Sequence, residues 1–581
     1  MRFRFSLSAT TGKPRALFRA RLAVDAITKI NLMWHPALGN FSIAITHGLP
    51  TTQRLFDEGL NLAFNFNQRE AQHRFNLTVH EEPDSCPMCW WGLAYAHGPY
   101  LNQPHGIHVD DPVIGLAAAT RASSLAATAA LSAKERGLIA VMATRFPPAG
   151  GNWTAAAERY VSELDALHTQ LPSDIDIQIF LAEALMLTMC GLDGYHFYSA
   201  DGTPHPRAKR AEALLVDAMT MEGASLHPYA PHLLIHLTEP SAASNASSPA
   251  FNGSSATGAA SGLPSAALLA SALATTDNQH LLHMPAHVYL RVGRYADAWS
   301  QNQEVAHRAD ADYLAHGQRP YAPAHDVAFG LYGACMAGMR AAAYASSATL
   351  RSIYQAYPDR SDGPGPEMGW SLQMTTRLRF GDWAGVVNFD AAMPRKWPYA
   401  EVLRHYANGS ALLHIGRYVD AQDSFELLEA TAVNVISRYQ PLVKVARLSL
   451  LASLQAHAGV GPAGLLSAAS TLEAAVDEQT SWVYDEPPKF HMPMRQCLGR
   501  LLLRAEAPER AHDVYAADLR QFPANGYSLW GLRQSMLMQP ARYTKAQVAT
   551  VEGQMAAAWK TADSPLNTSC AAFDRPLAQA V

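Results

Sequence analysis

The chain of 581 residues is poor in charged side chains and has no strong excess of either sign. Charged residues make up 16% of the sequence, against roughly 25% in ordinary soluble domains. The formal net charge is only −5. A chain of this balance carries no basic surplus to attract nucleic acid or an anionic membrane. We therefore expect no nucleic-acid partner.

Long apolar runs and familiar catalytic motifs are also missing. The sequence has no uninterrupted apolar stretch of the roughly 20 residues that a membrane-spanning helix needs, so we predict no membrane span. It contains no G-x-x-x-x-G-K-[ST] loop, no H-E-x-x-H, no G-x-S-x-G and no G-x-G-x-x-G that follows a predicted strand. These absences argue against a nucleotide site and against the standard hydrolase sites.

Cysteine is scarce, with six in the whole chain, so we expect no disulfide framework. Only Cys86 and Cys89 are close together, and Trp90 follows them where haem attachment needs a histidine. We therefore expect no haem. The pair is half of a zinc site if nearby histidines complete it, the candidates being His97, His105 and His108. The simpler interpretation, which we favour, is a repeat boundary with two incidentally close cysteines.

The sequence does contain repeats. A small residue is followed at a constant separation by an alanine, usually with a Gly-x-aromatic turn between them and an aromatic residue or a proline after them. The clearest copies are Gly59, Ala71, Phe75 and Pro83; Ala286, Gly293, Tyr295 and Ala298; Gly409, Gly416, Tyr418, Ala421 and Phe425; and Gly499, Ala511, Tyr515 and Pro523. This pattern is typical of the tetratricopeptide repeat, a helix–turn–helix unit of about 34 residues. Because one helix pair cannot bury its apolar face alone, such units stack. We predict an all-α, tetratricopeptide-like, right-handed α-solenoid.

Composition divides the chain further. We expect an N-terminal extension (1–45), repeats (46–240), a Ser/Gly/Ala-rich insertion (241–264), histidine-rich repeats (265–360), more repeats (361–563) and a frayed tail (564–581). Between the clear copies we predict helices over 117–146, 174–190, 208–221 and 266–275, and a loop over 361–367. The first residues are rich in arginine and serine and hold no acid before Asp25. They are either an organelle transit peptide or a disordered start, so a cytoplasmic or organellar location stays open.

Several motifs resemble those of a large, mostly uncharacterised family of tetratricopeptide-repeat proteins, common in bacteria and present in some algae. The similar segments are Leu55-Phe-Asp-Glu-Gly-Leu60, Cys89-Trp-Trp-Gly92, His232-Leu-Leu-Ile-His236, His280 to Arg294 with its HxxHMPxH core, Tyr484-Asp-Glu-Pro-Pro488 and Asn525-Gly526. They span about residues 51 to 563. The resemblance implies the solenoid fold and no settled activity. The insertion after Glu239 departs from the family, and we expect it to loosen one rim of the site.

Histidines are concentrated in three of the predicted helices. His232 and His236 stand at i, i+4, and so do His283 and His287, with His280 one turn earlier on nearly the same face. His325 opens the next helix. Since the first helices of successive repeats line the concave face, these six side chains should converge there. Neutral imidazole binds transition metals. We predict one transition metal ion (zinc, copper or iron) with His232, His236, His283 and His287 at its core. The alternative is a set of hydrogen-bonded core histidines.

Polar residues near this set complete the predicted groove. Glu239 and Asp326 could ligate the metal or orient a ring, and Tyr289 should face the groove. Asp485, Glu486 and His491 belong to a proline-broken helix entry that either meets a ligand or, more simply, is a capped loop. We expect a scaffold that binds a protein, peptide or small molecule in the concave groove. The alternative is a metal-dependent enzyme of hydrolase or oxidase type, with an open coordination position.

Overall fold

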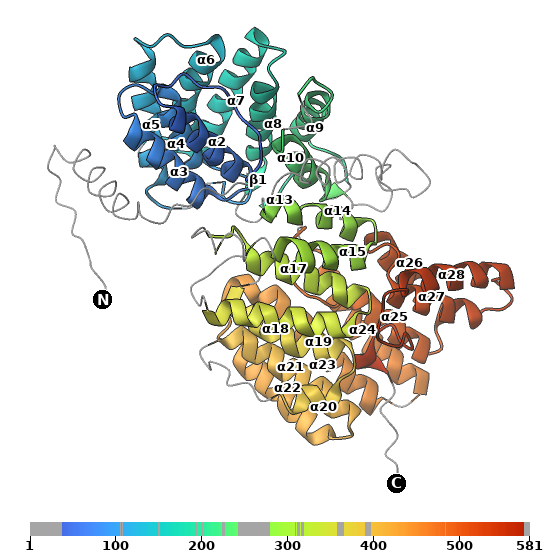
Figure 1. Ribbon diagram of the computed structural model, residues 1–581. Helices are drawn as coiled ribbons and strands as arrows, with labels where there is room; N and C mark the ends of the chain where they lie inside the picture. The colour runs from blue at the N-terminus through green and yellow to red at the C-terminus, as the bar shows by residue number, and fades with distance from the viewer. Residues whose placement is uncertain are drawn as a thin grey trace. The chain divides into compact units, whose positions relative to one another are not determined.

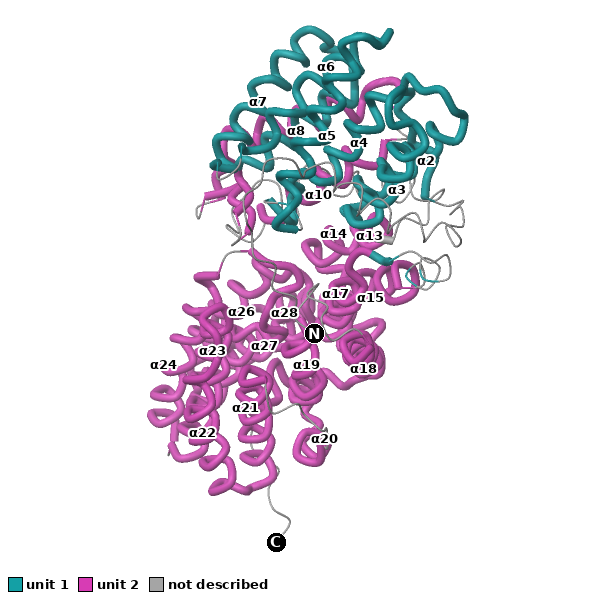
Figure 2. The backbone as a smooth tube through the Cα atoms, turned by 90° about the vertical axis from the view of Figure 1, so that its left-hand side faces the viewer, with its two compact units in different colours: residues 1–188, 275–278, 309–320 teal, residues 189–274, 279–308, 321–581 magenta. Residues whose placement is uncertain are grey.

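The computed structural model describes residues 38–574 apart from short gaps at 105, 107, 149–150, 192–193, 200–201, 224–226, 242–278, 308–309, 311–313, 315–318, 357–364, 390–396, 460 and 483. Most of the predicted N-terminal extension, the predicted insertion after its first residue and the predicted helix 266–275 therefore lie outside the described residues. The chain forms two compact units (Figure 2): residues 1–188 with 275–278 and 309–320, and residues 189–274, 279–308 and 321–581.

The described part of the first unit is helical. Its elements are α2 (Pro50–Phe64), α3 (Gln68–Glu81), α4 (Pro87–Ala96), α5 (Asp111–Ala126), α6 (Ala133–Met142), the 3-10 turn η1 (Ala143–Arg145), α7 (Trp153–Gln170) and α8 (Ile175–Leu187). Successive helices pack against each other as helical hairpins. The pairs are α2 with α3, α4 with α5 and α7 with α8. In the core, Arg145 and Glu183 form a buried ion pair with 3.1 Å between Nη2 and Oε1.

The second unit begins with a two-stranded antiparallel ribbon, β1 (Cys190–Gly191) and β2 (Gly194–Tyr195), in which Cys190 lies opposite Tyr195. The helices that follow are α9 (Pro206–Ala218), α10 (Tyr229–Thr238), α13 (Gln279–His283), α14 (Pro285–Arg291), α15 (Tyr295–Ser300), the π-helical η4 (Gln301–Ala306), α17 (Pro323–Met336), α18 (Arg340–Ala356), α19 (Gly365–Arg379), α20 (Trp383–Val387), α21 (Pro398–His414), α22 (Tyr418–Ala432), η5 (Ser437–Tyr439), α23 (Gln440–Ala458), α24 (Gly461–Thr480), α25 (Met494–Arg504), α26 (Pro508–Gln521), α27 (Gly526–Leu537), α28 (Lys545–Ala558) and η6 (Ala571–Phe573). Helices α17 to α24 stack as successive hairpins (Figure 1).

Glycines at the helix crossings explain the stacking. In the first unit, a Cβ on Gly59 would lie 2.7 Å from the Phe75 ring, and a Cβ on Gly92 would lie 2.3 Å from it. In the second unit, Tyr515 of α26 lies in the same way between Gly499 and Gly531. One aromatic ring of a second helix therefore packs against small residues of the first helix of its own repeat and of the next. This packing confirms the predicted all-α, tetratricopeptide-like solenoid.

The predicted helix over 117–146 is wrong as a single element, because α5 ends at Ala126 and α6 begins at Ala133. Ser132 and Glu135 form a capping box: the Ser132 hydroxyl accepts from the Glu135 amide, and the Glu135 carboxylate accepts from the Ser132 amide. The two side chains satisfy amide groups that the first turn of a helix leaves without partners. A new helix therefore starts where the apolar period alone predicts continuity.

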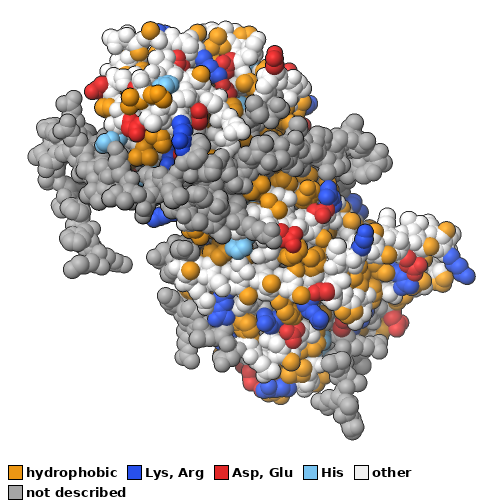
Figure 3. Space-filling view, in the orientation of Figure 1, with side chains coloured by type: hydrophobic (Ala, Val, Ile, Leu, Met, Phe, Trp, Pro, Cys, Tyr) orange, Lys and Arg blue, Asp and Glu red, His pale blue; other side chains and the backbone are white. Residues whose placement is uncertain are grey.

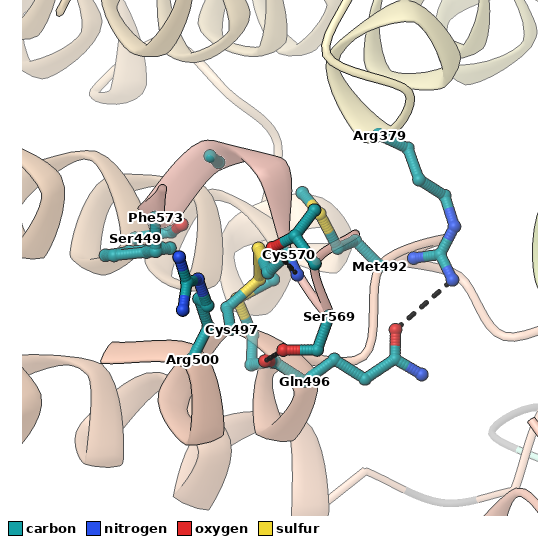
Figure 4. Close-up of a disulfide and its surroundings, with 12 residues drawn as sticks. Arg379, Ser449, Met492, Gln496, Cys497, Arg500, Ser569, Cys570 and Phe573 are labelled. Carbon is teal, nitrogen blue, oxygen red and sulfur yellow. Dashed lines mark hydrogen bonds between the residues drawn. A yellow bond between two sulfur atoms is a disulfide. The ribbon is translucent and has the colours of Figure 1, made fainter. Parts of the chain in front are cut away.

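Disulfides join Cys86 to Cys89 and Cys497 to Cys570. Neither of these two bonds was predicted from the sequence. The first pair occupies both thiols of the C-x-x-C motif, which leaves neither for zinc. Figure 4 shows the second pair, which ties the C-terminal segment to α25. That segment is not frayed as far as residue 574, because Phe573 is fully buried there. Its apolar side chains pack against the last repeats.

No helix among the described residues is both long and apolar enough to cross a membrane. On the face drawn in Figure 3, acidic and basic side chains are interspersed with apolar ones and do not gather by sign. That face therefore presents no extended field of one charge.

Candidate metal centre

Four helices of the second unit bring the predicted histidines together. His232 and His236 lie on α10, His280 and His283 on α13, His287 on α14 and His325 near the start of α17. The side chains on α10, α13 and α14 are each at most 1% exposed, and that of His325 is half-buried. The cluster is thus in the interior of the unit, whereas the sequence predicted side chains lining a groove.

The helix that carries three of these histidines is broken. The sequence predicts one helix through His280, His283 and His287, but α13 ends at His283 and α14 begins at Pro285. Proline has no amide hydrogen, and its ring meets the carbonyl four residues earlier, so it interrupts a helix that approaches from its N-terminal side. His283 and His287 nevertheless remain neighbours, with 4.6 Å between their ring centroids.

The first group of possible ligands joins α10 to α13. The His232 ring centroid lies 5.0 Å from that of His236 and 5.0 Å from that of His280. One nitrogen of each of the three rings lies within 4.8 Å of the others. Three nitrogen ligands at such spacing match the protein part of many transition-metal sites.

The second group joins α13, α14 and α17. His283 Nε2 lies 2.6 Å from His287 Nε2 and 3.2 Å from His325 Nε2. The ligand atoms of all three residues fall within 4.8 Å of one another. Three Nε2 atoms therefore face one another at this point. In the deprotonated form each offers one lone pair, and the three could coordinate one cation.

Oxygen acceptors hold the opposite side of several rings. His236 Nδ1 lies 2.9 Å from Glu239 Oε1, and His287 Nδ1 contacts both Glu239 and Glu486. His283 Nδ1 contacts the Asn302 side-chain oxygen. An oxygen at Nδ1 fixes the ring and leaves Nε2 to face a metal, which is the usual outer arrangement around metal-bound histidine.

Charge within the cluster is uneven. Burial lowers the pKa of His236 to about 3 and that of His325 to about 4, and burial also holds the pKa of His283 well below its usual value. These rings are neutral at pH 7, in the form that binds metals. Burial alone would also lower the pKa of His287, but the carboxylates of Glu239 and Glu486 outweigh it and raise the pKa to about 10.

Two residues near the cluster were not among the predicted site residues. Asn302 lies in η4, 19 residues from the ring that it contacts. The Tyr484 hydroxyl lies 3.3 Å from an oxygen of Glu239 and 3.3 Å from one of Glu486. Tyr484 is the first residue of the motif that contains Glu486, and this closeness in sequence was the one indication that Tyr484 belongs to the site. A π-helical asparagine gives no sequence signal.

The remaining predicted residues are divided between the cluster and its surroundings. Asp326 belongs to the cluster, with Oδ1 3.5 Å from His283 Nδ1. Tyr289 instead stacks under the Arg294 guanidinium at 4.3 Å, and Asp485 pairs with Lys489 at 2.7 Å. His491 packs against Tyr332, with 5.5 Å between ring centroids. The structure does not bring these last three into the cluster.

His97, considered above as a partner of Cys86 and Cys89 in a zinc site, lies in the first unit. Its Nδ1 lies 2.7 Å from Asp111 Oδ1.

Comparison with known proteins adds little to this geometry. No protein-family model matches the chain, and no curated protein is similar to it. Among solved structures, yeast Tom70 aligns with 86% of this chain and 99% of its own at 11% identity and a TM-score of 0.29. The P58(IPK) tetratricopeptide-repeat domain aligns with 85% of this chain and 100% of its own, at 11% identity and a TM-score of 0.20. A chain of the Naa15/Naa10 complex bound to HypK-THB aligns with 87% of this chain and 70% of its own, at 12% identity and a TM-score of 0.21. Likeness at these values carries no argument about function.

Proposed function

We propose that the protein is a tetratricopeptide-type scaffold that holds a transition metal (zinc, copper or iron) in the buried histidine cluster of its second unit. The observation that carries the proposal is that the Nε2 atoms of His287 and His325 both lie within hydrogen-bond distance of His283 Nε2. At most one proton can lie between two such nitrogens. Without a metal His287 is protonated at pH 7, so it would release its Nε2 proton on binding, and a divalent cation would then satisfy all three nitrogens at once.

The energetics of burial support a bound cation. Removing polar rings from water is costly unless each finds partners, and the histidines of α10, α13 and α14 are almost completely buried together. Coordination of a cation through Nε2 would offset part of that cost. The carboxylates of Glu239 and Glu486 would then neutralise part of the cation's charge from behind the His287 ring.

Four overlapping groups of three possible ligands occur among the described residues, and two of them consist of histidines alone. The first histidine group is His232, His236 and His280, and the second is His283, His287 and His325. We infer that the second group is the primary site, because His283 Nε2 lies 2.6 Å and 3.2 Å from the other two Nε2 atoms and two of its rings are held at Nδ1 by oxygen. The first group would hold a further ion of the same kind.

The scaffold part of the proposal rests on the fold. Stacked helix pairs create extended concave surfaces that solenoid proteins use for binding. We infer a protein, peptide or small-molecule partner on that surface.

Metal content tests the proposal directly. Protein purified without an affinity tag would be analysed by inductively coupled plasma mass spectrometry, beside the double variant His283→Ala/His287→Ala. The expected result is about one metal ion or more per chain in the parent, with loss of the primary ion in the variant. The matched control is His414→Ala/His457→Ala, a second pair of neighbouring histidines in the same unit, 5.9 Å apart; it should keep the metal.

Circular dichroism of each variant separates lost ligands from lost folding. Equal metal content in the parent and the His283→Ala/His287→Ala variant, with both folded, would refute the proposed site. No metal in either after incubation with zinc, copper or iron would leave the histidines as a hydrogen-bonded core. Metal-dependent turnover of a substrate by the parent would favour the enzyme alternative over a scaffold.

A further inference from the structure

A segment that follows α28 lies on the inner side of the second unit. Residues 563–574, here called the C-terminal segment, contain a single turn of regular structure, η6. That turn contacts α19, α21, α23 and α25, which are the first helices of four consecutive helix pairs. First helices line the concave face of a stacked-repeat protein. The C-terminal segment therefore covers part of the face that such proteins use for binding.

Side chains of these inner helices hold the C-terminal segment by its main chain. Ser453 of α23 donates to the carbonyl of Ala572 at 3.3 Å. Arg504 of α25 donates to the carbonyl of Phe573 at 2.8 Å. Every residue of a peptide has a main-chain carbonyl, so the same two donors can hold a peptide from another molecule.

Two neighbouring side chains of the C-terminal segment give the contact its specificity. Phe573 is fully buried and belongs to the apolar core formed by helices from α19 to α26. Asp574 forms an ion pair with the Arg500 guanidinium, and both of these side chains are partly exposed. A buried aromatic anchor with polar contacts at its rim is the usual anatomy of a specific interface. The face therefore favours a peptide with an aromatic residue followed by an acid.

A disulfide ties the C-terminal segment to this face. Cys570 of the segment is bonded to Cys497 of α25. Beside the bond, the Ser569 hydroxyl donates to the Gln496 carbonyl at 2.9 Å (Figure 4). A tethered segment competes with a free peptide at an effective concentration on the order of millimolar, so the face stays closed while the bond is intact. A dithiol reductant would open the bond by exchange, in which the reductant becomes a disulfide and the two cysteines become thiols.

We propose that the C-terminal segment is an intramolecular ligand that closes the concave face of the second unit. Its displacement would admit a partner of the same chemistry, an extended peptide with an aromatic residue followed by an acid. This inference rests on the scaffold part of the proposed function, to which it adds the class of partner and the competitor that controls access. The contacts that carry it involve none of the clustered histidines, so it does not depend on a bound metal.

Fluorescence anisotropy with a labelled, amidated peptide of residues 563–574 that carries Cys570→Ser tests this proposal. The receiver is the full chain with Cys497→Ser, Cys570→Ser and Phe573→Ala, which removes both the bond and the anchor of its own segment. We expect the peptide to bind this receiver at least about tenfold more tightly than the oxidised parent, whose face is occupied. A peptide that also carries Phe573→Ala should bind the receiver at least about tenfold more weakly.

Two further substitutions in the receiver locate the binding face. Arg500→Ala removes the guanidinium that pairs with Asp574, and it should weaken peptide binding. The matched control is Arg510→Ala, which removes a guanidinium that pairs with Glu473 in an exposed ion pair. It should leave the affinity unchanged. Circular dichroism checks that each receiver is folded.

Trapping of the peptide through a disulfide keeps the test independent of a Phe573 substitution in the chain. The full chain with only Cys570→Ser is incubated in a glutathione buffer with a peptide of residues 563–574 that retains its cysteine. We expect a mixed disulfide between this peptide and Cys497, located by mass spectrometry. The Phe573→Ala peptide should give at least about tenfold less of it.

Three results would each overturn the proposal: equal binding of the two peptides, binding to the oxidised parent as tight as to the receiver, or neither binding nor trapping by a folded chain. The last result would make the C-terminal segment a permanent part of the fold. A partner bound at another surface would then leave the scaffold part of the proposed function standing. Metal content is measured separately on the parent, so failure of the metal site and failure of this proposal are distinguishable.

Discussion

At the scale of single residues, Glu239 joins the two histidine groups, because it contacts one ring of each. Its carboxylate contacts His236 and His287 from behind, and the Tyr484 hydroxyl donates to it. Glu239→Gln keeps the shape but replaces one acceptor oxygen by an NH2 group that cannot accept from an imidazole N–H. We expect metal affinity to fall by about 10–100-fold, the usual effect of losing an orienting partner. Competition titration against a chelator measures it.

The control for that change is Asp485→Asn, one residue from Glu486 in the same loop. Asp485 pairs with Lys489 and contacts none of the histidines described above, so metal affinity should stay within experimental error of the parent. If Glu239→Gln binds metal as tightly as the parent, its carboxylate does not orient the ligands, and the proposed outer arrangement is wrong.

The sequence revealed ligand-type residues better than the contacts between them. Histidines at i, i+4 were visible as candidates, because helical spacing places them on one face whatever the tertiary structure. The partners Asn302 and Tyr484 were not visible. Tyr484 lies 245 residues from Glu239 along the chain, and only the folding of distant repeats against each other brings such residues into contact.

At the scale of the element, glycines at helix crossings govern how closely the repeats approach. A Cβ on Gly531 would lie 2.0 Å from the Tyr515 ring, and that ring is fully buried with its hydroxyl 2.6 Å from Ser569. The ring therefore has no room to withdraw. We expect Gly531→Ala to lower the free energy of unfolding by about 1–3 kcal/mol, the cost of overpacking, as measured by urea denaturation.

Gly553 in α28 is the matched control. Nothing lies within 4 Å of a Cβ added there, and the position is exposed. Gly553→Ala should raise the unfolding free energy by about 0.5–1 kcal/mol, because alanine loses less backbone entropy in a helix. If both substitutions stabilise the chain, close packing at the crossing does not limit the repeat.

Element boundaries were harder to predict than element types. Apolar period indicated helix through 117–146 and through His280 to His287, but a capping box at Ser132 and the missing amide of Pro285 start new helices there. Both signals were present in the sequence. Each signal acts over a single helical turn. The apolar period of the sequence is averaged over several turns and therefore does not show where one helix ends and the next begins.

At the scale of the whole molecule, the class of fold followed from repeated spacing alone. A small residue and an alanine at constant separation specify one helix crossing, and the crossing recurs from Gly59 to Gly531. The disulfide between Cys497 and Cys570 could not be inferred, since 73 residues separate its ends. Its formation depends on where the C-terminal segment packs after the repeats are in place.

Buried histidines also make the stability of the molecule depend on pH. Burial lowers the pKa of His491 to about 3 in the folded chain, whereas an unfolded histidine titrates near 6.5. Below that value the unfolded chain takes up a proton that the folded chain does not, so the free energy of unfolding falls as pH falls. We expect His491 alone to account for a loss of about 2 kcal/mol between about pH 7.5 and about pH 5.

Comparing His491→Gln with the parent isolates this contribution, because glutamine is polar and does not titrate. Urea unfolding of both proteins with a chelator present should give curves of stability against pH that approach each other on acidification by about 2 kcal/mol. Every other titrating group, including the cluster histidines, is common to the two chains and cancels in the difference. A constant difference between the parent and His491→Gln would mean that His491 takes up its proton in the folded chain as readily as in the unfolded one.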